Sequence, residues 1–363
     1  MNKVILAPAG GRKTQTIVDL CKMGDDKKRL IVTFTTTGQK VIQERLWKHD
    51  CYTSNIEVSG WYAFLLNHFI YPYVYDKYPM QSVNGLHFVE GRDPTRYKSG
   101  SKRYFDSLGK VYSNNIGKLA FDIAQASEGA CIERLQGIYH EIYFDEVQDL
   151  GGNDLEILQM LMESGIKIIA VGDVRQSTLK TSRTDRKNSD YNGLDKILWF
   201  RKMETKGICK IEERDVTWRC NQEIIDFADS VLPKKLEFPP TRSTQNKVTG
   251  HDGVFVVSWK NVREYIDCFS PACYRHSVST NSVDGGKATN FGLCKGETVS
   301  RGLIYPTRPI KNFLIDPKKQ LTNKSASLFY VAITRAKYSV AIVVEEPQKY
   351  NIKEWSPQGI AEK

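Results

Sequence analysis

The sequence lacks the features that mark several large classes of protein. No run of 18 apolar residues occurs in the 363 residues, so no membrane association is expected, and the apolar run before Pro8 is too short for a signal peptide. None of the eight cysteines forms a Cys-x-x-Cys pair, and Cys268 and Cys273, the closest two, have no second pair nearby to complete a zinc site. Repeats and low-complexity tracts are missing too. Because the cysteines match neither a redox motif nor a zinc site, we expect them to be reduced thiols of a cytosolic protein.

What is present is an ordinary globular composition with an excess of positive charge. Hydrophobic residues make up 40% of the chain and charged residues 26%, and the length allows two domains with cores of their own. The net charge of +10 favours a polyanionic partner, most simply a nucleic acid. Many basic proteins bind no nucleic acid, so charge alone leaves both interpretations open.

Apolar strands alternate with segments of helical spacing along most of the chain, which predicts an α/β fold with parallel sheets. The predicted strands cover residues 4–6, 29–34, 138–144, 166–171, 208–212, 253–258, 302–305 and 338–344, and the main helical segments cover 14–21, 39–48, 194–200 and 222–232. A boundary near Lys206-Gly207 predicts two domains, 1–206 and 207–363. Insertions are expected at about 50–118 and about 233–285.

A glycine-rich turn lies between the first predicted strand and the helix after it, where backbone N–H groups can hold phosphates. Its candidate nucleotide-binding residues are Gly10, Gly11, Arg12, Lys13 and Thr14. Lys13 would reach the β- and γ-phosphates and the Thr14 hydroxyl would bind Mg²⁺. Arg12 stands where phosphate loops usually have glycine, so it either strains the turn or adds a phosphate contact. A plain glycine turn is the alternative.

Two adjacent carboxylates, Asp145 and Glu146, follow the predicted strand at 138–144 in the run Asp-Glu-Val-Gln-Asp. Carboxylates at a strand end can hold Mg²⁺ and polarise an attacking water, which is the chemistry of nucleotide hydrolysis. We therefore expect Asp145 to be a metal ligand and Glu146 to be the general base.

Further motifs follow in a fixed order. Gly-Asp-Val-Arg-Gln ends at Gln176, Thr-Trp-Arg contains Trp218 and Arg219, Lys-Gly-Glu ends at Glu297, and Tyr-Val-Ala-Ile-Thr-Arg-Ala-Lys contains Arg335. Together with the glycine turn and the acidic run, they resemble the motifs of UvrD/Rep-type superfamily-1 helicases. The resemblance extends from residue 7 to residue 344.

The resemblance implies two RecA-like domains with the ATP site in the cleft between them. Gln176 would sense the γ-phosphate, Trp218 would stack on the base, and Glu297 would contact the ribose. Arg219 would touch the γ-phosphate and Arg335 would be the arginine finger, which is worth roughly 10³–10⁵ in rate. Trp218 as an ordinary core residue is the competing interpretation.

The same resemblance implies contacts with single-stranded DNA. Phe34 and Thr35 end the second strand in a Thr-Phe-Thr segment, and Trp61 belongs to a weaker motif and is otherwise a core residue. The aromatic residues that the family has after the position of Gln176 are missing here. Lys180 and Arg183, in a basic loop with Arg186 and Lys187, would hold phosphates instead, unless that loop is only a solvated surface.

The predicted function is ATP-dependent, Mg²⁺-dependent translocation from 3′ to 5′ on single-stranded DNA or a tailed duplex. Only six residues precede Ala7, so the family's adenine-reading glutamine motif is expected to be absent, and about 75 residues between Arg219 and Lys295 leave no room for its large accessory domain. Short proteins of this kind also resemble the helicase-like partner of Gabija-type anti-phage systems, which accompanies an OLD-family nuclease. A regulatory ATPase subunit is therefore the alternative, and a scaffold without hydrolysis is a third.

Overall fold

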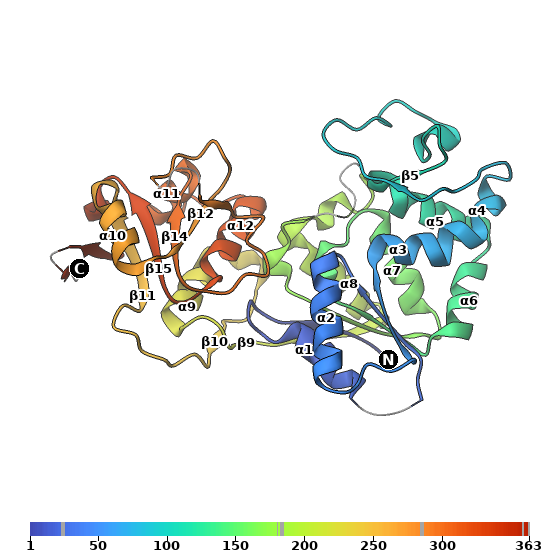
Figure 1. The fold of residues 1–363 in the computed structure, drawn as a ribbon, viewed down its shortest axis with the longest axis horizontal. Coiled ribbons are helices and arrows are strands. Elements are labelled where there is room, and N and C mark those ends of the chain that lie inside the picture. The colour runs from blue at the N-terminus through green and yellow to red at the C-terminus, as the bar shows by residue number, and fades with distance from the viewer. Residues whose placement is uncertain (23–25, 180, 182–184, 284–286, 358, 362–363) are drawn as a thin grey trace. The chain divides into compact units, whose positions relative to one another are not determined.

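The computed structural model describes every residue of the chain except 23–25, 180, 182–184, 284–286, 358 and 362–363, and it divides into two compact units (Figure 1). The first unit contains Met1–Leu6, Lys13–Gly172 and Leu179–Glu212. The second contains Glu213–Lys363 and two short pieces, Ala7–Arg12 and Asp173–Thr178. These pieces directly follow two strands of the first unit in the sequence.

The first unit is built on a six-stranded sheet with the order β3-β2-β6-β7-β1-β8, and its neighbours from β3 to β1 pair in parallel. Its strands are β1 Asn2–Leu6, β2 Arg29–Thr33, β3 Ile56–Gly60, β6 Glu141–Phe144, β7 Lys167–Gly172 and β8 Cys209–Glu213, with β4 Leu86–His87 and β5 Val111–Tyr112 in a separate small sheet. Its helices are α1 Lys13–Cys21, α2 Thr36–Lys48, α3 Trp61–Leu65, α4 Tyr71–Lys77, α5 Ile116–Ala126, α6 Ala130–Ile138, α7 Asn153–Glu163 and α8 Lys196–Thr205.

The central strands of this sheet are apolar and buried along most of their length. Every residue of β2 is buried, and Ile31 packs with Ile17 of α1 and Ile42 of α2 in one core cluster. Parallel strands are covered by helices on both faces, which explains why these segments are continuous apolar runs. β3 is an edge strand in which only Ile56 is fully buried. It lies inside the range that was expected to be an insertion, because so few of its residues are apolar and buried.

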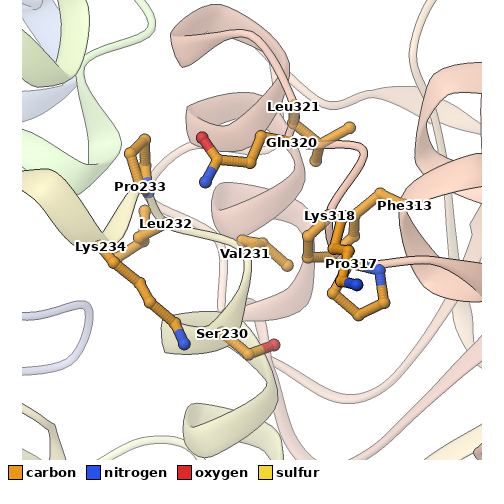
Figure 2. Close-up of a pocket in the computed structure, with 10 residues that line it drawn as sticks. All are labelled: Ser230, Val231, Leu232, Pro233, Lys234, Phe313, Pro317, Lys318, Gln320 and Leu321. Carbon is orange, nitrogen blue, oxygen red and sulfur yellow. The ribbon is translucent and has the colours of Figure 1, made fainter.

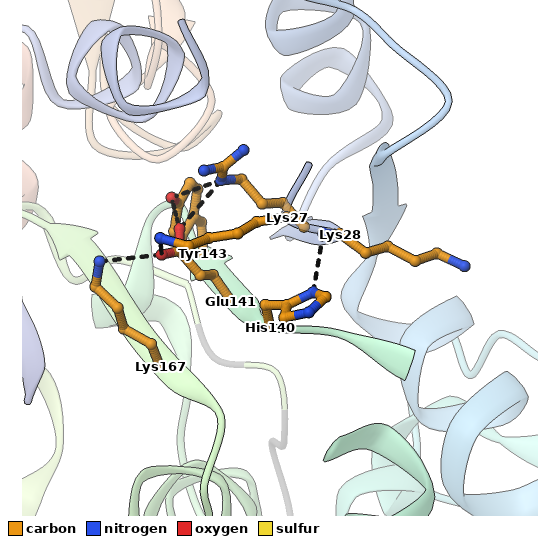
Figure 3. Close-up of polar contacts among 7 residues, drawn as sticks. Lys27, Lys28, His140, Glu141, Tyr143 and Lys167 are labelled. Atoms are coloured by element: carbon orange, nitrogen blue, oxygen red, sulfur yellow. Dashed lines mark hydrogen bonds and ion pairs between the residues drawn. The ribbon is translucent and has the colours of Figure 1, made fainter. Parts of the chain in front are cut away.

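A polar cluster joins three neighbouring strands of the first unit at their amino ends (Figure 3). Glu141 begins β6 and lies in register with Arg29 of β2 and Lys167 of β7. Its carboxylate accepts from Arg29 Nε at 3.1 Å, from Lys167 Nζ at 3.0 Å, from Lys27 Nζ at 3.3 Å and from the Tyr143 hydroxyl. Burial by itself raises the pKa of Glu141, but these hydrogen bonds outweigh it and lower the pKa to about 2.

The second unit is built on a seven-stranded sheet with the order β13-β12-β14-β15-β11-β16-β17, in which every pair is parallel except β16 with β17. Its strands are β11 Gly253–Ser258, β12 Ala272–Arg275, β13 Thr289–Asn290, β14 Val299–Tyr305, β15 Ala336–Val344, β16 Lys353–Ser356 and β17 Gly359–Ala361, with β9 Val216–Thr217 and β10 Arg242–Ser243 as a separate pair. Its helices are α9 Gln222–Ser230, α10 Val262–Phe269, α11 Arg308–Ile315 and α12 Asn323–Ile333.

Helix α12, which carries the first part of the last predicted motif, is deeply buried in the second unit. Thr322 caps it by accepting from the Ser325 N–H, and every residue from Ala326 to Ile333 is buried. It leads directly into β15, the strand between β14 and β11. The last motif is therefore fixed by the core of this unit. The prediction of an α/β chain with two parallel-sheet units is confirmed, and none of the described helices is long and apolar enough to cross a membrane.

Candidate functional site

In the first unit, the predicted metal ligands meet at the carboxyl ends of the strands. Lys13 begins α1, and Thr14 lies in its first turn. The Thr14 hydroxyl donates to Asp145 Oδ2 at 3.0 Å, across 131 residues of sequence. β7 separates β1 from β6 in the sheet order, so the contact reaches past one intervening strand. The glycine turn and the acidic run, found independently in the sequence, therefore supply one oxygen-lined site.

Asp145 is held in a strongly desolvated position. Its exposed fraction is 4%, and burial, followed by the charge of neighbouring Glu146, raises the pKa of its carboxyl group. Bonding from Thr14 and the charge of Lys13 act in the opposite direction. A buried carboxylate beside a second carboxylate is stabilised in its charged form by a cation. The hydroxyl and carboxylate oxygens are ligands that Mg²⁺ prefers, so these residues fit that ion.

The described residues contain no group of three or more His, Cys, Asp or Glu side chains that could hold a metal ion alone.

Glu146 is placed by an unusual backbone conformation. Its φ of 56° and ψ of 39° are left-handed, so the chain turns sharply immediately after the buried strand. The Gln148 side-chain amide donates to the Glu146 carboxylate, and Gln148 itself is fully buried. Glu146 is only partly buried. The turn therefore places the Glu146 carboxylate at a partly exposed position, where the side-chain amide of Gln148 orients it. A general base needs to be oriented in this way.

In the second unit, the glycine turn packs against the segment that carries Trp218. Thr217 Oγ1 donates to Ala9 O at 2.6 Å, and the Trp218 N–H donates to Gly10 O at 3.2 Å. Gly10 has a φ of 75°, and a Cβ added there would lie 2.6 Å from the Cβ of Arg219. Only glycine fits this close approach.

Arg12 and Trp218 form a stacked pair. The Arg12 guanidinium lies 3.6 Å from the centroid of the Trp218 ring, in the range of a cation–π contact. Arg12 has a left-handed φ of 56°, and its side chain is exposed, as is 48% of Trp218. This exposure excludes the alternative in which Trp218 is a core residue. Arg12 thus both strains the turn and covers one face of the ring.

Arg335 lies at the centre of a second cluster in this unit. Its exposed fraction is 1%, and its guanidinium donates to Gln176 Oε1 at 2.9 Å, to Val331 O at 2.9 Å and to Glu297 O at 3.4 Å. Gln176 in turn donates to Asp173 Oδ2 at 2.7 Å. Arg335 therefore joins its own motif to the motifs that contain Gln176 and Glu297. Nothing in the sequence spacing of these motifs predicts the bond between Arg335 and Gln176.

Two other predicted nucleotide contacts lie close to this cluster. Arg219 Nη1 donates to Thr334 O at 3.0 Å, next to Arg335 in the chain. Glu297 is exposed, and its carboxylate accepts from the Tyr274 hydroxyl at 3.1 Å. The residues that the resemblance connects with the phosphates and the ribose thus gather around Arg335 within the second unit.

The predicted DNA contacts are less uniform. Trp61 is 1% exposed and packs with Phe34, Phe64 and Phe144, so it has no free face for a base, in keeping with the alternative core interpretation. Phe34 is half-buried beside it, and Thr35 caps α2 by accepting from the Gly38 N–H.

The basic loop that was expected to hold phosphates is only partly described. Lys180 and Arg183 lie outside the described residues. Arg186 and Lys187 are exposed, and Lys187 lies 3.8 Å from a carboxylate oxygen of Glu156.

Sequence reasoning missed an aromatic pair on the same unit. Tyr62 follows Trp61 on α3, and its ring lies 6.1 Å from that of Phe88, which is 68% exposed. The Tyr62 hydroxyl donates to Thr181 O at 3.2 Å. A helical period from buried Trp61 would have placed Tyr62 outside the core, but no short-range pattern links it with Phe88.

A separate hollow of about 270 Å³ lies in the second unit, between the end of α9 and the segment joining α11 to α12 (Figure 2). Its lining is mainly apolar and includes Lys234 and Lys318. None of the residues predicted to bind nucleotide or DNA lines it, so it is distinct from the site described above.

No protein-family model matches this sequence, and no curated protein matches it. Among solved structures, the crystal structure of arterivirus nonstructural protein 10, a helicase, matches 96% of this chain at 14% identity with a TM-score of 0.49. The same arterivirus protein in complex with DNA matches 96% at 13% identity and 0.48, and the PRRSV helicase matches 95% at 13% identity and 0.43. This chain spans 61%, 62% and 52% of their respective lengths.

Proposed function

We propose that this chain is an ATPase that requires Mg²⁺ and is stimulated by single-stranded DNA, of the UvrD/Rep type. The observation that carries the proposal is the 3.0 Å bond between Thr14 and Asp145, which joins the start of a helix after a glycine turn to the acidic end of a buried strand. A hydroxyl and a carboxylate in this arrangement are the protein ligands of a nucleotide-bound Mg²⁺.

The residues around this bond have separable roles in hydrolysis. Lys13 neutralises the β- and γ-phosphates, and Glu146 accepts a proton from the attacking water. Mg²⁺, when bound, stabilises the negative charge of the phosphate oxygens. Gln176 and Arg335 act together, because each fixes the side-chain position of the other through their 2.9 Å bond.

The base and the sugar are bound by residues of the second unit. Trp218 offers an exposed ring face for stacking, and the exposed carboxylate of Glu297 bonds a ribose hydroxyl. Arg219, which is directed toward the carbonyl before Arg335, neutralises the γ-phosphate. Coupling of hydrolysis to movement from 3′ to 5′ along a strand is the consequence that the resemblance implies.

The decisive experiment is a pair of substitutions. Glu146→Gln should retain nucleotide binding and lower the rate of hydrolysis roughly 10²–10⁴-fold, because the carboxylate base is removed while Asp145 remains. Lys13→Ala should abolish both binding and hydrolysis. Glu163→Gln, which replaces a carboxylate at the end of α7, is the matched control and should behave as wild type. Hydrolysis by Glu146→Gln at the wild-type rate would show that Glu146 is not the base.

A regulatory ATPase subunit that works beside an OLD-type nuclease is a second candidate, as in anti-phage systems. One observation favours it. The described residues between 220 and 294 include α9, β10, β11, α10, β12 and β13, all within the second unit, and thus supply no separate accessory domain to hold a duplex. Activity that depends on a co-purified nuclease would support this candidate over an autonomous motor.

A further inference from the structure

The segment between α4 and α5 presents large aromatic side chains to solvent. It contains the two-residue strands β4 and β5 and two short 3-10 helices, Gly100–Arg103 and Ser113–Asn115, and residues 90–92 and 96–100 are mostly exposed. Phe88 is 68% exposed and Tyr97 is 83% exposed. Neither ring contributes to the core, so neither is explained by the stability of the fold.

The segments that carry Phe88 and Tyr97 both contact the ring of Tyr112. The ring of His87 lies 5.1 Å from the ring of Tyr112, and Lys98 Nζ lies 5.3 Å from the same ring. Tyr112 is buried, so His87 and Lys98 both pack against a fixed ring. Phe88 follows His87 and Tyr97 precedes Lys98, so each exposed ring is one position away from a residue that contacts Tyr112.

Positive charge surrounds these rings. Arg92, Arg96 and Lys102 are exposed, and none forms an ion pair with a carboxylate in the described part of the chain. The Arg96 guanidinium lies 5.5 Å from the Tyr97 ring. We call Phe88, Arg92, Arg96, Tyr97 and Lys102 the insertion face.

Three acidic residues lie in the same segment, and one of them, Glu90, is exposed. Asp93 accepts from the Thr95 hydroxyl at 2.7 Å, and Asp106 is paired with His87 at 2.7 Å. Between residues 86 and 110, six arginines and lysines outnumber these three carboxylates, so the insertion face is a basic surface with aromatic rings in it.

The insertion face continues toward the start of α3. The Phe88 ring contacts that of Tyr62, and the Tyr62 hydroxyl bonds the backbone of Thr181, in the loop that also carries Arg186 and Lys187.

We propose that the insertion face binds single-stranded nucleic acid, with Phe88 and Tyr97 stacking on bases and Arg92, Arg96 and Lys102 neutralising phosphates. Exposed rings interspersed with cations suit a single strand, because its bases are free to stack on the rings. The bases of a duplex are already stacked on each other, and an acidic peptide has no bases to stack. The proposal rests on the proposed function and supplies the stacking contacts that are missing after Gln176.

The test is the affinity of the full-length chain for a fluorescent oligothymidylate, measured by anisotropy over a range of salt concentrations. Phe88→Ala with Tyr97→Ala should weaken binding roughly 5- to 150-fold for each base unstacked. The slope of log affinity against log salt should stay the same, because stacking releases no counterions. Changing Arg92, Arg96 and Lys102 to Ala should instead flatten that slope by about 0.7 for each phosphate that is no longer neutralised.

An abasic oligonucleotide of equal length isolates stacking from charge. Wild type should bind it more weakly than oligothymidylate, whereas the double aromatic variant should bind both alike. Trp47→Ala, which removes a ring 66% exposed on α2, is the aromatic control. Changing exposed Lys48, Lys206 and Lys210 to Ala is the charge control. Both controls should match wild type.

Two results would overturn the proposal. One is wild-type affinity of the aromatic variant for oligothymidylate, which would leave these rings to a protein partner. The other is an equal decrease in the affinity of that variant for the abasic strand. Failure of the proposed function would give a different result. In that case the wild-type chain would hydrolyse no ATP, whatever its affinity for single-stranded DNA.

Discussion

Single residues distinguish the proposed nucleotide site from a simple phosphate loop. Arg12 stands in a left-handed conformation and lies over Trp218 at 3.6 Å. A left-handed φ costs a non-glycine residue of order 1 kcal/mol or more, so the stacked contact offsets strain in the turn. The Trp218 ring then has one face remaining for a purine.

Trp218→Ala should therefore raise KM for ATP more than it lowers kcat, because stacking is shared by the ground state and the transition state. Trp218→Phe should restore most of the affinity, and discrimination between ATP and GTP should be modest. Steady-state kinetics with both nucleotides measure this. The control is Trp259→Ala, a ring 40% exposed elsewhere in the second unit. An unchanged KM in Trp218→Ala would remove this residue from the base site.

Glu141 makes stability depend on pH. Its pKa is about 2 in the folded chain, against 4.5 ordinarily. A lowered pKa means that the stabilisation is complete above about pH 4.5 and is lost as the pH falls toward 2.

Glu141→Gln should lower the free energy of unfolding by about 3 kcal/mol near neutral pH, because Arg29 would stay buried without its carboxylate. The variant should also lose less stability than wild type between pH 4.5 and 2. Urea unfolding at several pH values measures both effects. Exposed Glu44→Gln on α2 should reproduce the wild-type curve, and a parallel pH dependence in Glu141→Gln would show that another carboxylate is responsible.

At the scale of elements, the glycine turn is fixed by what lies against it. Gly10 and Gly207 have nearly equal φ values of 75° and 72°, but a Cβ on Gly10 would meet Arg219 and Thr217 whereas one on Gly207 would meet nothing within 4 Å. Gly10→Ala should abolish nucleotide binding, and Gly207→Ala should cost only its backbone strain, about 1 kcal/mol. Calorimetric titration with ATP and thermal unfolding separate the two effects. Normal ATP binding by Gly10→Ala would mean that this packing does not shape the site.

The strands were predictable because they are buried on both faces. The apolar runs at 29–34 and 253–258 correspond to β2 and β11, whose residues are all buried. β3 was not predicted, since an edge strand with one fully buried residue carries little apolar signal.

The candidate site was predictable only in part. Motif order led to Thr14 and Asp145, which the structure brings within 3.0 Å of each other. The bond from Arg335 to Gln176 and the contact of Phe88 with Tyr62 depend on tertiary packing across 159 and 26 positions. Periodicity describes neighbours within a helix or strand, so it carries no information about such pairs.

At the scale of the whole molecule, small size should limit unwinding. Opening each base-pair step costs roughly 1.4 kcal/mol, which ATP hydrolysis can supply only if the protein stays attached between steps. The isolated chain should therefore hydrolyse ATP with single strands but separate duplexes poorly, and a tethering partner should improve unwinding. A strand-displacement assay on a 3′-tailed duplex with trapping DNA measures this. Efficient separation of long duplexes by the monomer would establish an autonomous helicase.

The two ends of β6 have opposite effects on the free energy of the fold. At its amino end, Glu141 is satisfied by surrounding cations, and at its carboxyl end Asp145 is buried beside a like charge. The first arrangement stabilises the sheet, and the second makes it less stable, a cost that the proposed cation site would offset. Stability and activity should therefore conflict only at the carboxyl edge of this sheet. Asp145→Asn should yield a more thermostable but inactive protein, whereas substitutions in helices far from that edge should raise the stability without loss of activity.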